Sequence, residues 1–262
     1  MTMTISYMSA NEVARETGFA MHGWGHGDEA TNDAFRPLET FAERFDALCA
    51  RARDLGFEAI DVWGAHLNPE WATDAHVEAA RAALARHDLR VASLATWIGP
   101  GNAERACELA LALGTSIVGG GYSGDARAVA DAFRRHDVRL GVENHPERTT
   151  AELLERIDAL GDGGFGATVD TGWWGTHGYD AARAIEELGA RVRHVHLKDV
   201  SHRGDPHETC RWGEGVVDAE ACVRALQRIG YDGAISVEHE PETFDPSDDV
   251  RAMRAELEEW LR

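Results

Sequence analysis

Four short apolar segments in the second half of the chain each end in a side chain that can bind a metal ion. These side chains are Glu143, Asp170, His196 and Glu238, and β-forming residues precede each of them. Each interval between them carries the periodic apolar pattern of an amphipathic helix. Because the carboxyl ends of successive parallel strands meet at one end of the fold, we expect these four side chains to converge. The three carboxylates would repel each other there unless a divalent cation lay among them.

Strand and helix patterns alternate along the whole chain of 262 residues. We expect eight β-strands, at residues 18–24, 57–63, 90–97, 115–120, 138–143, 165–170, 192–197 and 234–238. A helical pattern follows each of them, so the order predicts a closed (β/α)8 TIM barrel of the α/β class. An open doubly wound sheet is the alternative, but the GxGxxG and Walker patterns that often accompany it are missing. We expect one domain over residues 1–262, with residues 1–16 as an N-terminal extension.

The acidic charge balance narrows the classes of partner. With 46 acidic and 26 basic residues and a net charge of −20, the chain lacks the basic face that nucleic acids require. No apolar run is long enough to span a membrane, and the N-terminus has no secretory leader pattern, so we expect a cytoplasmic protein. The acidic excess, with Lys198 as the one lysine, also suggests a salt-adapted surface.

Each predicted metal ligand also has a simpler explanation. A carboxylate at a strand end often caps the next helix, as Asp170 would before its Thr-Gly turn. A histidine in an apolar strand, such as His196, is often a hydrogen-bonded core residue. The joint placement at four consecutive strand ends favours the metal site, because buried carboxylates need a compensating partner. Such a ligand set suits Mn²⁺ best, with Mg²⁺, Co²⁺ or Zn²⁺ as alternatives.

Five segments together resemble the xylose isomerase-like TIM barrel superfamily, which includes sugar phosphate isomerases and epimerases. They are GVENH, VDTGW, HVHLKD, WGEGVVD (212–218) and GAISVEHE (233–240). The resemblance extends from about residue 18 to residue 261. It implies that Glu143, Asp170, His196 and Glu238 bind one divalent metal ion. It also implies a small-molecule sugar or cyclitol substrate.

A site of this kind supports proton transfer next to a carbonyl group, through a metal-stabilised enediolate. The resemblance makes Glu238 the first candidate for the base. An epimerase needs a second acid/base group on the opposite face of the substrate. Ketose 3-epimerases carry that Glu six residues after the strand-five ligand, where this chain has Thr149. Glu147 is a substitute candidate, although it is also explained as a solvated or helix-capping residue.

Lys198 and several aromatic residues are further candidates at the barrel mouth. Lys198 could hold a substrate oxygen or donate a proton, or it could simply pair with Asp199. The candidates for substrate binding are His22, His66, Trp97, His145, Trp173 and His207. The histidines would contact hydroxyl groups, and the tryptophans would form apolar walls against sugar C–H faces, unless they only fill the barrel rim.

Four functions therefore remain in competition. The first is a sugar or inositol-type isomerase or epimerase, and the second is a lyase that dehydrates a keto-cyclitol or keto-sugar. A phosphodiesterase like endonuclease IV fits less well, because that family uses more histidines and this chain is acidic. A non-catalytic sugar-binding barrel is the fourth. The sequence leaves open whether the chain forms a homo-oligomer.

Overall fold

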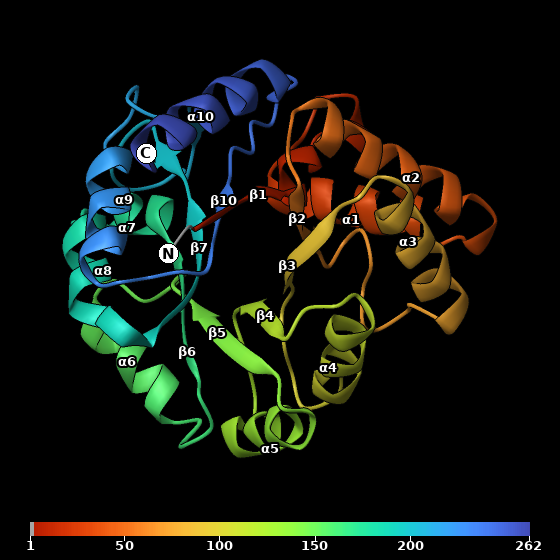
Figure 1. The fold of residues 1–262 in the computed structure, drawn as a ribbon, viewed down its shortest axis with the longest axis horizontal. Helices are drawn as coiled ribbons and strands as arrows, with labels where there is room; N and C mark the ends of the chain where they lie inside the picture. Colours follow the sequence, from red (N-terminus) through yellow and green to blue (C-terminus); the bar gives the residue numbers. More distant parts are fainter. Residues whose placement is uncertain (1–2) are drawn as a thin grey trace.

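The computed structural model describes residues 3–262 as a closed barrel of parallel strands, surrounded by helices (Figure 1). Around the barrel, the strands follow the order β1-β10-β7-β6-β5-β4-β3-β2. Neighbouring strands run parallel throughout, as the pairs β1–β10 and β5–β6 illustrate. The predicted (β/α)8 TIM barrel is therefore confirmed.

The barrel strands are β1 (Thr4–Met8), β2 (Ala59–Trp63), β3 (Arg90–Ala95), β4 (Ile117–Gly120), β5 (Arg139–Glu143), β6 (Gly166–Asp170), β7 (Val192–Leu197) and β10 (Ala234–Val237). The helices are α1 (Trp24–Phe35), α2 (Leu38–Asp54), α3 (Asp74–Arg86), α4 (Ala103–Ala112), α5 (Ala126–His136), α6 (Thr150–Asp158), α7 (Thr171–His177), α8 (Ala181–Leu188), α9 (Ala219–Arg228) and α10 (Ser247–Trp260). Short 3₁₀ helices cover Ser9–Glu12, Arg15–Thr17 and Gly189–Arg191.

The first strand is not the one that the sequence predicted. Residues 18–23 form turns and bends before α1, which begins at Trp24, whereas β1 (Thr4–Met8) pairs with both β10 and β2. Gly18 and Gly23 have φ values of 66° and 89°, in the left-handed region that strand residues do not adopt. The strand Thr4–Met8 therefore belongs to the barrel, and the prediction that residues 1–16 are an N-terminal extension is wrong for the described residues; Met1 and Thr2 lie outside them.

The other seven predicted barrel strands are confirmed to within three residues, and their helices pack as the apolar patterns indicate. On α2, for example, Phe41, Phe45 and Leu48 are fully buried against the barrel, and burial of each such side chain contributes roughly 1.5–3 kcal/mol. No helix among residues 3–262 is long and apolar enough to cross a bilayer.

Two features of the C-terminal half go beyond the predicted pattern. Helix α7 follows β6 without a loop, because Asp170 accepts hydrogen bonds from Gly172 N (2.8 Å) and Trp173 N (3.1 Å). The long segment after β7 contains a small antiparallel sheet of β8 (Asp199–Val200) and β9 (Thr209–Cys210). Both features lie at the mouth of the barrel that holds the candidate site.

Candidate active site

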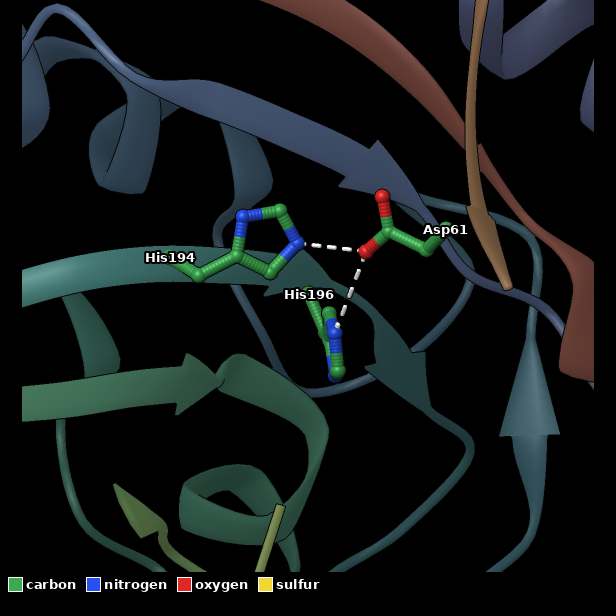
Figure 2. A group of neighbouring side chains, drawn as sticks. All are labelled: Asp61, His194 and His196. Atoms are coloured by element: carbon green, nitrogen blue, oxygen red, sulfur yellow. Dashed lines mark hydrogen bonds and ion pairs between the residues drawn. The ribbon is translucent and has the colours of Figure 1, made fainter. Parts of the chain in front are cut away.

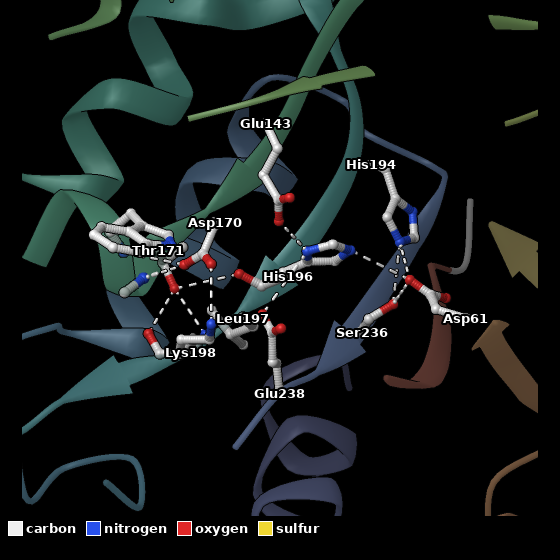
Figure 3. Close-up of polar contacts among 12 residues, drawn as sticks. Asp61, Glu143, Asp170, Thr171, His194, His196, Leu197, Lys198, Ser236 and Glu238 are labelled. Atoms are coloured by element: carbon white, nitrogen blue, oxygen red, sulfur yellow. Dashed lines mark hydrogen bonds and ion pairs between the residues drawn. The ribbon is translucent and has the colours of Figure 1, made fainter. Parts of the chain in front are cut away.

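The four predicted ligands lie at the carboxyl ends of β5, β6, β7 and β10, close together at the mouth of the barrel (Figure 3). Glu143 and Asp170 are the last residues of their strands, His196 is the last but one of β7, and Glu238 directly follows β10. All four are at least nine-tenths buried. The pairing of β5 with β6, β6 with β7, and β7 with β10 makes their strands adjacent.

His196 lies between the carboxylates. Its Nδ1 is 2.5 Å from Oε1 of Glu143 and 3.8 Å from Oε2 of Glu238. Burial alone would lower the pKa of His196, but Glu143 and Glu238 raise it well above its usual value. Burial would likewise raise the pKa of Glu143, yet His145 and His196 hold it well below its usual range. Nδ1 therefore faces the region where the carboxylate oxygens converge.

Lys198 neutralises part of the acidic charge in the site. Its Nζ lies 3.1 Å from Oδ2 of Asp170 and 3.4 Å from Oε2 of Glu238, and it donates a hydrogen bond to Oε2 of Glu240 at 3.2 Å. Burial would lower the pKa of Lys198, but these carboxylates raise it well above its usual value. The alternative of a Lys198–Asp199 pair is wrong. The Asp199 carboxylate instead accepts backbone N–H groups of the loop, including those of Gly213 and Gly215.

The donor set fits a divalent cation. Oδ2 of Asp170 and Oε2 of Glu238 are buried, and the ammonium group of Lys198 is their ion-pair partner. The carboxylates of Glu143, Asp170 and Glu238 outnumber this one ammonium group, and the excess of buried negative charge is costly unless a further cation compensates for it. Ligand atoms of Glu143, His145 and Asp170 lie within 4.8 Å of one another. Oxygen donors with one or two imidazoles and no thiolate are typical of Mg²⁺, Mn²⁺ and related ions. Asp170 also caps α7 through Oδ1, so the capping and the metal-ligand explanations are compatible.

A cavity of about 1310 Å³ opens above these residues. Its walls differ in chemistry from one half of the barrel mouth to the other. On the side of β5, β6, β7 and β10 the wall is charged, with the predicted ligands, Lys198 and Glu240. The side of β1, β2 and β3 is aromatic, with Trp24, Trp63 and Trp97. Trp24 and Trp97 are 42% and 51% exposed, and their rings are thus accessible to a ligand.

Among the predicted substrate-binding residues, Trp97, His145, Trp173 and His207 line this cavity. The Nε2 atom of His145 lies 3.1 Å from Oε2 of Glu143. The ring of His207 stacks on Trp173 at 4.1 Å between centroids, and its Nδ1 is 2.7 Å from Oγ1 of Thr176. Burial lowers the pKa of His207 to about 3, so this ring is neutral at ordinary pH.

Three other predicted residues do not line the cavity, and they are corrections to the sequence analysis. His66 is buried beside Phe35, with Nδ1 3.1 Å from Oγ of Ser9, and is a core residue. His22 is exposed on the turn before α1, a consequence of the misplaced first strand. Glu147 is buried outside the cavity, where Oε1 lies 3.7 Å from Nη1 of Arg156.

Two carboxylates of the site were missed by the sequence analysis. Glu240 lines the cavity and contacts Lys198; burial and the neighbouring Glu238 raise its pKa well above the usual range. Its position two residues after Glu238 could have predicted this placement, because alternate residues of an extended segment share a face. Asp61 lies on β2, and its Oδ2 is 3.5 Å from Nε2 of His196. An acidic residue inside the apolar run FEAIDVW was the corresponding signal.

Solved structures with the same fold span almost the whole chain. The probable 3-DHS dehydratase AsbF of Bacillus anthracis has a TM-score of 0.71 at 16% identity, over 98% of this chain and 99% of its own. A D-allulose 3-epimerase of Methylomonas sp. in complex with D-allulose has a TM-score of 0.66 at 18% identity, over 100% and 98%. A xylose isomerase-like TIM barrel protein of Mycobacterium smegmatis in complex with magnesium has a TM-score of 0.71 at 17% identity, over 99% and 96%.

The sequence comparisons identify the family. An uncharacterised protein of Methanocaldococcus jannaschii is 30% identical over 119 residues, which are 42% of this chain and 40% of that protein. The match thus spans less than half the length of this relative. The sequence profile of the xylose isomerase-like TIM barrel family matches residues 49–262, which include β2–β10 and all four predicted ligands. The chain therefore belongs to the xylose isomerase-like TIM barrel family.

Proposed function

We propose that the protein is a divalent-metal-dependent isomerase or epimerase that acts on keto-sugars or inositol-type cyclitols. The observation that carries the proposal is the convergence of Glu143, Asp170, His196 and Glu238 on one cavity, where three buried carboxylates outnumber the single ammonium group of Lys198. Mn²⁺ is the favoured ion, because it accepts both carboxylate and imidazole ligands and leaves positions for substrate oxygens. The fold is shared with a D-allulose 3-epimerase that was solved with its keto-sugar.

The proposed reaction is proton transfer at the carbon next to a carbonyl group. A bound divalent cation would supply electrostatic stabilisation for the negative charge that develops on the carbonyl oxygen. Glu238 is the proposed base, since its carboxylate lines the cavity beside the other predicted ligands. Lys198 would donate a proton or a hydrogen bond to a substrate oxygen, because its Nζ lies among the carboxylates at the cavity floor.

The size of the cavity bears on the choice of substrates. Small-molecule sites usually enclose about 300–1,000 Å³, and this cavity of about 1310 Å³ is larger. Trp97 and Trp173 are proposed as apolar walls against C–H faces of the substrate, with His145 and His207 as partners for hydroxyl groups. Substituted keto-sugars and keto-glycosides therefore belong in the substrate panel beside free ketoses and inososes.

The proposal is tested by deuterium exchange from D₂O. Incubation with Mn²⁺ and each member of the panel should introduce deuterium at a carbon next to the carbonyl of at least one substrate, as detected by mass spectrometry or proton NMR. Glu238→Gln should abolish this exchange, while Glu186→Gln, on the outer face of α8, serves as the control that keeps it. Absence of Mn²⁺-dependent exchange across the panel would refute the assignment.

A dehydratase of the same substrates is the second candidate. It is favoured by one observation: Glu147, the carboxylate considered for the opposite face of the substrate, pairs with Arg156 outside the cavity. An epimerase needs acid/base groups on both faces, whereas dehydration needs one base and one proton donor for the leaving hydroxyl group. Formation of an ultraviolet-absorbing enone together with loss of water would favour the dehydratase. Interconversion of two sugars of equal mass would favour the epimerase.

A further inference from the structure

Asp61 is a charged residue in the interior of the barrel. Its side chain, on β2, is 0% exposed, in a region that TIM barrels normally fill with layers of apolar side chains. A buried carboxylate persists only if hydrogen bonds or positive charge compensate for its lost hydration. The groups that compensate Asp61 therefore indicate what this residue does.

Hydrogen bonds from four other strands surround the Asp61 carboxylate. Ser6 Oγ donates to Oδ1 at 2.7 Å, while Ser93 Oγ and Ser236 Oγ donate to Oδ2 at 3.0 and 2.7 Å. His194 Nε2 is also hydrogen-bonded to Oδ2 (Figure 2). One of these contacts is to Oδ1 and three are to Oδ2, the oxygen on the side of His196. The carboxylate is thus held in one orientation by β1, β3, β7 and β10.

The same Oδ2 atom faces the predicted metal ligand His196. Nε2 of His196 lies 3.5 Å from Oδ2 of Asp61 and has no hydrogen-bond partner within residues 3–262. The opposite ring nitrogen, Nδ1, faces Glu143 and Glu238 in the cavity (Figure 3). The ring of His194 stands edge-on to that of His196, at 5.2 Å and 84°. Asp61 and His194 together thus contact the side of His196 that points away from the cavity.

We propose that Asp61 is a positioning residue for the metal centre. It keeps the proton of His196 on Nε2 and fixes the plane of the ring, so that the lone pair of Nδ1 points to the cation. Histidine ligands commonly donate their other ring N–H to a carboxylate, which sets both tautomer and orientation. The inference rests on the metal site of the proposed function. Asp61 is not itself a ligand in it; from β2 it orients His196, one of the ligands that β5, β6, β7 and β10 contribute.

A second cation bound directly by Asp61, His194 and His196 is the competing explanation. Ligand atoms of these three residues lie within 4.8 Å of one another. However, Oδ2 of Asp61 already accepts three hydrogen bonds, from Ser93, Ser236 and His194. A cation there would have to displace these donors. It would also have to enter a region where the Asp61 and His194 residues are 0% exposed. The geometry therefore favours a hydrogen-bonded carboxylate over a second metal ion.

Metal titration of the full chain tests the proposal. In isothermal titration calorimetry with Mn²⁺, the wild type should bind one equivalent, and Asp61→Asn should bind about 10- to 100-fold more weakly. Glu12→Gln is the matched control, because Glu12 is also a buried, hydrogen-bonded carboxylate but contacts Tyr7, Arg15 and Arg51 instead of the site. It should keep the wild-type affinity. The proposal would be overturned if Asp61→Asn bound Mn²⁺ with unchanged affinity. It would also be overturned if the wild type bound two equivalents of Mn²⁺ and the variant lost the second.

A second measurement needs no variant and stands if Asp61→Asn fails to fold. Long-range ¹H–¹⁵N NMR of the wild type with diamagnetic Mg²⁺ or Zn²⁺ should show His196 as the Nε2–H tautomer. A His196 ring protonated at Nδ1 would overturn the role of Asp61 even if metal binds. A wild type that binds no divalent ion would instead refute the proposed function, and the positioning role with it.

Discussion

Replacement of Lys198 by Met tests the electrostatics of the site most directly. Lys198 Nζ lies 3.1, 3.2 and 3.4 Å from carboxylate oxygens of Asp170, Glu240 and Glu238, and its side chain is 4% exposed. At an effective dielectric constant of 20, each of these contacts corresponds to about 5 kcal/mol of attraction, most of which is offset by the lost hydration of the ions. Removal of one partner of a buried ion pair typically destabilises a protein by about 3–5 kcal/mol.

We therefore expect Lys198→Met to lose about 3–5 kcal/mol of unfolding free energy in the absence of metal. The variant leaves the carboxylates without their ammonium partner, so a divalent cation should restore stability. A cation at 100 times its Kd adds about 2.7 kcal/mol to a protein that binds it only when folded. Because the variant carries one more uncompensated negative charge, its gain should equal or exceed that of the wild type.

Urea unfolding followed by tryptophan fluorescence, with EDTA or with added Mn²⁺ or Mg²⁺, measures these differences. Arg228→Met is the control, because Arg228 pairs with Glu186 at 2.6 Å on the surface, with the two side chains 57% and 47% exposed. Such exposed pairs contribute less than about 1 kcal/mol. The reasoning is refuted if Lys198→Met costs no more than this control, or if the cation stabilises the variant less than the wild type.

Three further outcomes are expected. Burial lowers the pKa of His66 to about 3, so between about pH 3 and 6.5 the unfolded chain binds a proton that the folded chain does not. The unfolding free energy should therefore fall by about 1.4 kcal/mol per pH unit below pH 6.5. In urea unfolding, His66→Gln should remove this contribution to the pH dependence. Glu147→Gln should keep deuterium exchange within about threefold of the wild-type rate, a change below 1 kcal/mol in the barrier; a loss of 100-fold would return Glu147 to the mechanism. The unfolding free energy should rise from about 0.1 M to about 2 M KCl, because salt screens the repulsion of a chain with net charge −20; a fall would contradict a salt-adapted surface.

The positions of the four predicted ligands followed from local patterns. Glu143, Asp170, His196 and Glu238 each end or nearly end an apolar β-run, and parallel topology brings such ends together whatever the intervening helices are. The same logic placed Trp97 at the cavity, and Trp173 and His207, predicted from the segments that follow β6 and β7, line it as well. It failed at residues 18–24, where an apolar run with two glycines resembles a strand but turns instead.

Contacts between distant segments decided the rest. His66 and Glu147 follow barrel strands, as the ligands do, yet Ser9 and Arg156 hold them away from the cavity. The role of Asp61 depends on serines and a histidine contributed by four other strands. The sequence by itself determined the alternating order of strands and helices and the residue types at the strand ends, because both are properties of short segments. Only the closed barrel decided which of these side chains share one cavity, because that depends on strand register and on packing between residues far apart in the chain.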